Sequence, residues 1–231
     1  MKKMSRNNRI AIIGASDLQL PLIERAKQMG FETHVFAWAA GDVGEKAADH
    51  FYPVSIVEVD RILEECRKIR PEAVVSIASD LAAITVNKVA NALGLPANPP
   101  ETALIATNKY EMREAFQRAG LPVPAFVKRG AEDDLSPVYD MNLPVIVKPT
   151  DRSGSRGIYK LTSFDSLREK VVCACGESFE KKAIIEEYIE GEEYSCECIS
   201  QNGIHHFLAI TKKYTTGAPH LLRPVIWSLP R

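Results

Sequence analysis

The chain has 231 residues, of which 45% are hydrophobic, with 29 basic and 30 acidic side chains. This length and composition predict a globular protein that buries a real core, in one large domain or two small ones. Because the charges nearly cancel, no overall field attracts nucleic acid or a membrane surface, and we expect neither as a partner.

Targeting and redox features of the sequence favour a cytoplasmic protein. No apolar segment approaches the roughly 20 residues that span a bilayer, and the polar start, residues 1–9, leads into no signal-peptide core. The five cysteines are odd in number and include two C-x-C pairs, Cys173 with Cys175 and Cys196 with Cys198. Structural zinc usually needs about two to four residues between paired ligands, so we favour plain cysteines over a metal site.

The first part of the chain, residues 1–104, is expected to form a Rossmann-like domain. Apolar runs typical of buried strands alternate there with helical patterns of apolar residues. This alternation predicts an α/β fold with a parallel, doubly wound sheet, which ends at the proline-rich stretch 96–100. The expected strands and helices are residues 10–13, 20–29, 33–37, 57–69, 73–78 and 81–93.

From about residue 105 the pattern changes to that of an α+β domain. A helix at 108–119 is expected to stop at Gly120, since Pro122 and Pro124 cannot continue it. Strands of largely antiparallel character should follow, separated by turns and by one helix near 164–175. The expected strands are residues 145–148, 158–161, 183–187 and 194–199.

Two turns of the first domain are candidate ligand contacts. The turn at Gly14 lies between a strand and a helix but lacks the second and third glycines of a dinucleotide fingerprint, so an ordinary turn is favoured. Ser79 and Asp80 end a strand at the carboxyl edge of the predicted sheet, where ligands of open α/β sheets bind. They are predicted substrate contacts, with helix capping by Asp80 as the alternative.

The second domain contains a candidate phosphate site. Lys148 ends an apolar strand, and a loop of Ser, Gly and Arg residues, 150–157, leads into the next strand. Polyphosphate needs backbone N–H groups that point at it, which Gly and Ser permit, and a fixed cation, which Lys148 supplies. The loop joins two strands and so differs from a Walker loop, which leads into a helix. Taken alone, it has a solvated hairpin as its alternative.

An apolar strand that runs into acidic residues, 184–195, follows the loop. Backbone C=O and N–H groups of such a linker can pair with an adenine edge, and a later carboxylate can accept both ribose hydroxyls. A charged hairpin is the alternative for this segment. The cation, the loop and the acidic segment form an ordered set of elements for a nucleoside triphosphate within one small domain.

These elements together resemble the ATP-grasp superfamily, the fold of D-alanine–D-alanine ligase, biotin carboxylase and the large subunit of carbamoyl-phosphate synthase. Residues 107–113 and 120–124 are similar to the family pattern N-K-x-x-x-R…G-(I/L)-P-(V/T)-P. The resemblance implies a pre-ATP-grasp domain at 1–104 and an ATP-grasp small lobe at 105–190. Residues 191–231 would then begin the second lobe, which stays incomplete.

The resemblance also implies a set of ATP contacts, in which two lysines and a loop hold the phosphates and the acidic segment holds the nucleoside. The implied residues are Lys109 and Lys148 at the phosphates, Ser153, Gly154, Ser155 and Gly157 in the loop, Glu186, Glu187, Tyr188 and Ile189 at the adenine, Glu193 at the ribose, and Lys213 at a later phosphate contact.

The implied function is that of an ATP-dependent ligase. ATP phosphorylates a carboxylate to an acylphosphate, which an amine or another nucleophile then attacks, with Mg²⁺ bridging the phosphates. The family's Mg²⁺ ligands follow in a Glu…Glu-x-Asn pattern, which does not occur before Arg231. We therefore expect ATP and a small carboxylate as partners, and a homo-oligomer as one possible assembly. We expect no metal ligands in this chain and, for that reason, impaired turnover. A non-catalytic nucleotide-binding or regulatory module and an NAD-binding Rossmann protein are the alternatives.

The last residues, 221–231, depart from the family pattern. Codons for residues 221–230 can be chosen so that one added T in front reads Phe-Ile-Glu-Thr-Gly-His-Leu-Glu-Pro-Ala, which fits the family's continuation. We therefore hypothesise a one-nucleotide loss near codon 221, natural or introduced in cloning, which the sequence of the parent gene would test. A native short protein with a hydrophobic last strand is the competing explanation.

Overall fold

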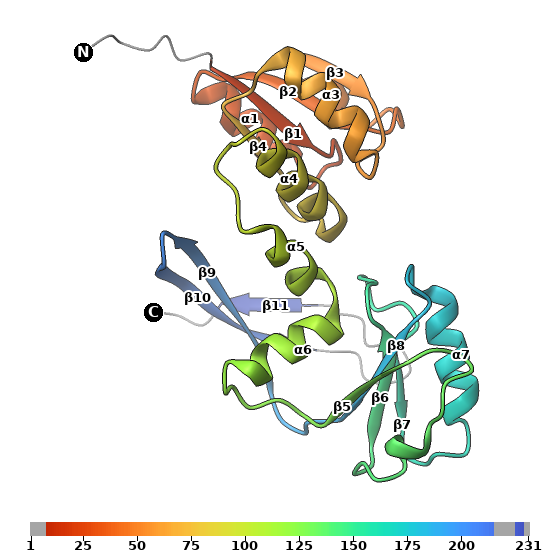
Figure 1. Ribbon diagram of the computed structural model, residues 1–231. Coiled ribbons are helices and arrows are strands. Elements are labelled where there is room, and N and C mark those ends of the chain that lie inside the picture. The colour runs from red at the N-terminus through yellow and green to blue at the C-terminus, as the bar shows by residue number, and fades with distance from the viewer. Residues whose placement is uncertain (1–7, 215–224, 229–231) are drawn as a thin grey trace. The chain divides into compact units, whose positions relative to one another are not determined.

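The computed structural model describes residues 8–214 and 225–228, and the ribbon is shown in Figure 1. The chain divides into two compact units, Met1–Thr107 and Asn108–Arg231. The sequence prediction had placed its first boundary at residue 104. The second lobe was predicted to begin at residues 191–231. The part of it after residue 214 lies outside the described residues, apart from 225–228.

The first unit is built around a parallel sheet, as predicted. Its strand order is β3-β2-β1-β4, and all three pairings are parallel. The elements in chain order are β1 (Arg9–Ile13), α1 (Leu20–Gln28), β2 (Glu32–Ala37), α2 (Val43–Ala47), β3 (His50–Pro53), α3 (Val59–Ile69), β4 (Ala73–Val75), α4 (Asp80–Ala92) and α5 (Pro100–Thr107).

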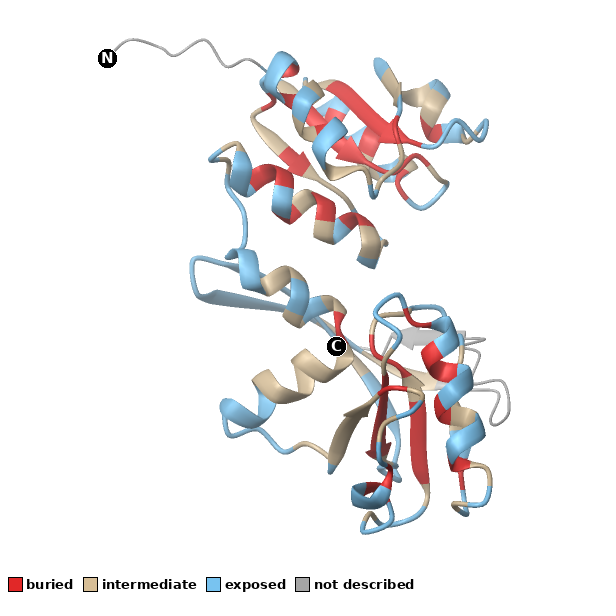
Figure 2. Cartoon of the chain, turned by 45° about the vertical axis from the view of Figure 1, so that its right-hand side comes forward, coloured by how far each residue is buried: buried red, intermediate tan, exposed pale blue. Residues whose placement is uncertain are grey.

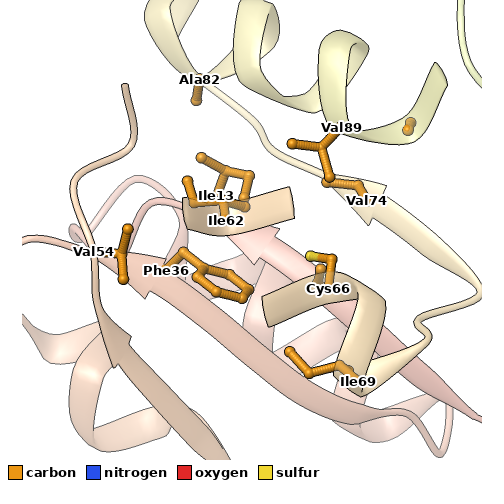
Figure 3. Close-up of a cluster of buried hydrophobic side chains, with 11 residues drawn as sticks. Ile13, Phe36, Val54, Ile62, Cys66, Ile69, Val74, Ala82 and Val89 are labelled. Carbon is orange, nitrogen blue, oxygen red and sulfur yellow. The ribbon is translucent and has the colours of Figure 1, made fainter. Parts of the chain in front are cut away.

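Both faces of this sheet are buried, because alternate residues of each strand point to opposite sides. On β1, Ile10 and Ile12 join a cluster with Ile23 of α1, while Ile13 joins the cluster of α3 and α4. Figure 3 shows the second cluster, in which the ring of Phe36 lies among aliphatic side chains. Its cysteine, Cys66, is a thiol in this core, because burial raises its pKa to about 12.

Three elements of the first unit were absent from the sequence prediction. Strand β3 is an edge strand of only four residues, His-Phe-Tyr-Pro, and α2 has only five residues, so neither carries enough periodicity to be read. Helix α5 begins at Pro100, where the prolines were read as a break. Conversely, β4 stops early at Val75, because Ser76 bonds to the Ile13 carbonyl through its hydroxyl.

The second unit is α+β, also as predicted, and contains two antiparallel sheets. Their orders are β5-β8-β6-β7 and β11-β10-β9. The elements are α6 (Lys109–Arg118), β5 (Phe126–Arg129), the 3-10 helix η1 (Ser136–Val138), β6 (Val145–Pro149), β7 (Tyr159–Leu161), α7 (Leu167–Glu177), β8 (Ala183–Glu187), β9 (Glu193–Gln201), β10 (Ile204–Tyr214) and β11 (Val225–Ser228). Strands β5 and β10 were not predicted.

One face of the four-stranded sheet is packed as apolar core, and the other, called the polar face below, carries charged side chains beside the buried Ile146 and Ile184. Val145 and Val147 of β6 and Ile185 of β8 are fully buried and join the core that includes α7. The intervening residues point the other way by the period of two. Lys148 of β6 and Glu186 of β8 therefore share the opposite face of this sheet.

The hairpin of β9 and β10 is exposed along most of its length (Figure 2). Several large apolar side chains lie on it, among them Ile199, Ile204 and Phe207. No helix in the described part of the chain is both long enough and apolar enough to cross a membrane.

Candidate functional site

The polar face of the four-stranded sheet centres on a buried carboxylate, Glu186. Its side chain is 7% exposed and accepts a hydrogen bond from Arg113 Nε of α6 at 3.0 Å. The second carboxylate oxygen pairs with Lys148 Nζ. Glu186 lies opposite Ile146 in the register, so Lys148 is two residues further along on the same face. One carboxylate thus positions two cations.

The charge state of Glu186 follows from these contacts. Burial by itself raises the pKa of Glu186, but the charge of Lys148 and the hydrogen bonds from Arg113 and Lys148 outweigh burial and lower the pKa below 4.5. The carboxylate is therefore ionised at neutral pH. With two cations around one carboxylate, this face has a net positive charge that suits an anionic ligand.

Lys109 joins the start of α6 to the predicted phosphate loop. Its backbone N–H donates to the Thr150 carbonyl at 2.7 Å, and its Nζ donates to the Arg152 carbonyl. Asn108, which is buried, caps α6 by accepting from the N–H groups of Tyr110 and Glu111 at 3.0 and 3.2 Å. The structure thereby brings Lys109 to the base of the loop that follows Lys148.

The loop itself has a firm base and an exposed tip. Asp151 accepts from the N–H groups of Phe179 and Glu180 at 3.0 and 2.9 Å, which ties the base to the turn after α7. Residues 153–156 are exposed. Gly154, Ser155 and Gly157 have φ of 75°, 57° and 65°, the left-handed region that favours glycine and small residues. Gly157 also packs against Pro149 and Glu177.

The segment predicted to bind adenine is fixed mainly by its backbone. The N–H of Glu187 donates to the Ala125 carbonyl at 3.0 Å, and the N–H of Tyr188 donates to the Pro144 carbonyl at 2.9 Å. The Glu187 carboxylate accepts from the backbone and side chain of Asn142 at 2.8 and 2.9 Å. Ile189 is 68% exposed and offers an apolar surface.

Glu193 and Lys213, the predicted ribose and phosphate contacts, are direct partners across β9 and β10. Lys213 Nζ lies 3.0 Å from Glu193 Oε1, and the lysine side chain is 14% exposed. The neighbouring lysine, Lys212, pairs with Glu192. Each of the two adjacent lysines therefore has its own carboxylate.

Ser79 and Asp80 line a cavity of about 600 Å³ within the first unit. Ser79 is the N-cap of α4, since its hydroxyl accepts from the Ala82 N–H at 3.2 Å. Asp80, considered above as a cap, is instead the first residue of the helix. Ala78, with φ of 56°, lies in the turn before the helix, and Asn98 also lines the cavity.

The turn at Gly14 is closed by Gln19. This buried side chain accepts from the Ser16 N–H and hydroxyl at 3.2 and 2.6 Å and donates to the Ile77 carbonyl at 2.7 Å. A Cβ on Gly14 would lie 3.0 Å from Gln19 Cδ, so the space above the glycine is filled. A pyrophosphate needs that space, which counts against the NAD alternative.

Sequence reasoning missed the roles of three side chains. Arg113 lay in the quoted motif without a role, although it follows Lys109 by four residues and so shares its helix face. Asn142 and Asp151 act through loop contacts across the fold, at sequence separations of 45 and 28–29 residues, which no local pattern reveals.

Several known proteins are similar to this chain in sequence. Residues 141–228 match the family described as "ATP-grasp domain". The chain is 27% identical over 150 residues to D-alanine–D-alanine ligase of Hydrogenovibrio crunogenus, covering 60% of this chain and 47% of that protein. It is also 27% identical over 174 residues to the L-arginine-specific L-amino acid ligase of Bacillus subtilis, covering 71% and 42%. The chain spans about half the length of the curated relatives it matches.

Solved structures show the same fold. An L-amino acid ligase from Bacillus licheniformis matches 99% of this chain and 56% of its own, with a TM-score of 0.80 and 22% identity. The biotin carboxylase domain of 2-oxoglutarate carboxylase from Hydrogenobacter thermophilus, solved with MgADP, has a TM-score of 0.76 and 17% identity, covering 93% and 52%. The second unit of this chain is thus similar in sequence to the ATP-grasp domain family, and the chain has the fold of these solved structures.

Proposed function

We propose that this chain supplies the ATP-binding part of an ATP-dependent ligase that activates a carboxylate as an acylphosphate. The observation that carries the proposal is the polar sheet face, where buried Glu186 holds Lys148 and Arg113. Similarity to the ATP-grasp domain family supports the same function, since two of the similar curated proteins are amino acid ligases. An amine or another nucleophile would attack the activated carboxyl group.

Lys148 and Lys109 are the proposed phosphate contacts. Glu186 restricts the rotamers of Lys148, so less side-chain entropy remains to be lost when a phosphate binds. Lys109 is held at the loop base through the carbonyl of Arg152. Fixed cations stabilise a transferring phosphoryl group without reorganising during the reaction. The exposed tip, Ser153 to Ser155 with Gly157 behind it, would close over the β and γ phosphates.

The nucleoside would lie against the segment from Glu186 to Ile189. Exposed Ile189 offers an apolar contact for the base, and the backbone of Glu187 and Tyr188 is already fixed to the sheet. Glu193 is the proposed ribose contact, although its carboxylate pairs with Lys213 in this structure. ATP binding would therefore exchange this ion pair for separate contacts to ribose and phosphate.

The carboxylate substrate is proposed to contact Ser79 and Asp80 at the start of α4. The partial positive charge of the helix N-terminus at Ser79 favours a carboxylate, whereas the Asp80 carboxylate would contact a donor group of the substrate, and the cavity has room for a small molecule. Magnesium, when bound with ATP, would supply Lewis-acid stabilisation of the phosphate charge. In the described residues of the second unit, no three His, Cys, Asp or Glu side chains form a metal-ligand group. We therefore assign no step to the metal.

The test is ADP release from ATP and Mg²⁺ by the full chain, with a panel of amino acids as carboxylates. We expect release to depend on the carboxylate and to fall in Lys148→Ala, whereas Lys170→Ala should match the wild type. Lys170 is the control because it lies on α7, which packs on the other face of the sheet. Release without a carboxylate would contradict the ligase reaction, and ATP binding without release would favour the non-catalytic module.

A further inference from the structure

Three potential metal ligands meet at the edge of the sheet in the first unit. Glu32 Oε1 lies 2.8 Å from His50 Nε2 and 3.5 Å from His34 Nε2. The three ligand atoms all lie within 4.8 Å of one another. This group takes no part in the ATP site proposed above.

The strand register explains why the group forms. Glu32 and His34 are two residues apart on β2 and so share one face of the sheet. His50 is the direct partner of His34 across the parallel pair of β2 and β3. The two imidazole rings stack with centroids 4.6 Å apart. The arrangement is therefore built into regular backbone and does not depend on a loop.

His34 is buried and one of its ring nitrogens has no hydrogen-bond partner. The residue is 5% exposed, and Nε2 is without a partner among the described residues. Its other nitrogen, Nδ1, lies 3.0 Å from the Tyr52 hydroxyl. With Nδ1–H donating to that hydroxyl, Nε2 is the ring nitrogen that would be left to bind an ion between His34 and Glu32.

We infer that Glu32, His34 and His50 form a binding site for a divalent transition-metal ion such as Zn²⁺. Two imidazoles and one carboxylate suit Zn²⁺, Ni²⁺ or Co²⁺, whereas Mg²⁺ prefers oxygen ligands. Three protein ligands leave a fourth position for water. His50, with its side chain 51% exposed on the edge strand, can turn toward the ion without disturbing the core.

Neighbouring groups support the ligands in this geometry. Arg9 Nε lies 3.2 Å from Glu32 Oε2, which leaves Oε1 to face the two histidines. Tyr52 orients His34 through Nδ1, as outer-shell partners of metal-bound histidines usually do. The Tyr52 ring is itself fixed by stacking on Phe36, with centroids 4.6 Å apart. A bound ion would tie the edge strand β3 to β2 and stabilise the first unit by mass action.

The experiment is a titration of the chelator-treated full chain with ZnCl₂ by calorimetry, together with Co²⁺ absorption and thermal unfolding. We expect one Zn²⁺ per chain at this site and a higher unfolding temperature with Zn²⁺. His50→Ala and Glu32→Gln should each bind at least roughly tenfold more weakly. Tyr52→Phe keeps the ring and should lose about 10–100-fold in affinity through the outer shell.

The matched control is His206→Ala, an exposed histidine on β10, which should bind Zn²⁺ like the wild type. Thiolate-to-cobalt absorption would instead indicate Cys196 and Cys198, whose sulfurs lie 3.5 Å apart, and would contradict the assignment if it accounted for all binding. Absence of Zn²⁺ binding, or equal affinity in wild type and His50→Ala, would overturn the inference. Because His50 is exposed, circular dichroism of its variant should show an intact fold.

Discussion

Lys148 and Glu186 form an ion pair on the polar face of a sheet whose other face is packed as hydrophobic core. They lie on the neighbouring strands β6 and β8, offset by two residues in the register. Arg113 of α6 approaches the same carboxylate from outside the sheet. The four-stranded sheet therefore serves both as the structural centre of the second unit and as the support of its charged site.

Neutralising Glu186 should destabilise the second unit. Glu186→Gln keeps the shape of the side chain but leaves Lys148 and Arg113 facing an uncharged amide. Hydrogen bonds to charged groups contribute about 1.5–3 kcal/mol, so we expect a loss of that size in the free energy of unfolding, measured in urea. The control is Glu193→Gln: the Glu193 carboxylate is 49% exposed, and its pair with Lys213 should contribute below about 1 kcal/mol. Equal losses would contradict the assignment.

The two glycines of the phosphate loop should respond differently to alanine. Both have positive φ, which costs alanine roughly 1–2 kcal/mol. A Cβ on Gly157 would also lie 3.1 Å from Pro149 Cγ and Glu177 Cγ, whereas one on Gly154 meets nothing within 4 Å. We therefore expect Gly157→Ala to lower the urea midpoint more than Gly154→Ala. A larger effect at Gly154 would show that the loop base is packed otherwise.

Asn108 has two roles, as the N-cap of α6 and as a partner of Glu180, and two substitutions should distinguish them. Its oxygen accepts from the first turn of the helix, and its Nδ2 donates to Glu180 at 2.9 Å. Asn108→Ala removes both contacts, while Asn108→Ser keeps a good cap. Thermal unfolding should show the alanine variant to be less stable than the serine variant by about 1 kcal/mol. If both lose the same amount, the bond to Glu180 is the dominant contribution.

Lowering the pH should destabilise the first unit, because it protonates Asp49. Burial by itself raises the pKa of Asp49, but hydrogen bonds from Thr33 and the ion pair with Lys27 lower it to about 2, against an ordinary 3.8. A carboxyl group whose pKa is lower in the folded than in the unfolded protein stabilises the fold fully at pH values above its unfolded pKa. That stabilisation is lost as the pH falls through the folded pKa.

The difference in unfolding free energy between wild type and Asp49→Asn should therefore be constant above about pH 4 and shrink between pH 4 and pH 2. Urea unfolding at several pH values measures it. Asp17→Asn, at an exposed turn position, is the control and should show no comparable change. A difference that stayed constant down to pH 2 would be the contrary result.

The sequence revealed most of the elements whose patterns are long or strongly periodic. The helix read at 57–69 is α3, Val59–Ile69, and the strand read at 183–187 is β8, because an amphipathic stripe and a continuous apolar run are both local signals. Strand β5, Phe126–Arg129, was missed because its four residues follow two prolines. It exists because it pairs with β8, which is a tertiary cause.

The candidate site could be predicted only in part, because some of its contacts also depend on tertiary structure. Lys148 and the glycines of the loop stand in a local pattern, so their neighbourhood could be predicted. The contacts of Glu186 with Lys148 and Arg113 depend on strand register and on the packing of α6, because the partners are separated in sequence by 38 and 73 positions. The cluster of Glu32, His34 and His50 requires β3, which carried no readable pattern.

The most direct test of the account is calorimetric titration of the full chain with ATP and Mg²⁺, comparing wild type, Lys148→Ala and Lys170→Ala. Loss of a charge-assisted contact to phosphate should weaken binding by roughly tenfold to a hundredfold in Lys148→Ala, with no change in Lys170→Ala. Circular dichroism should show both variants folded. Unchanged ATP affinity in Lys148→Ala would contradict the assignment of this sheet face as the ATP site.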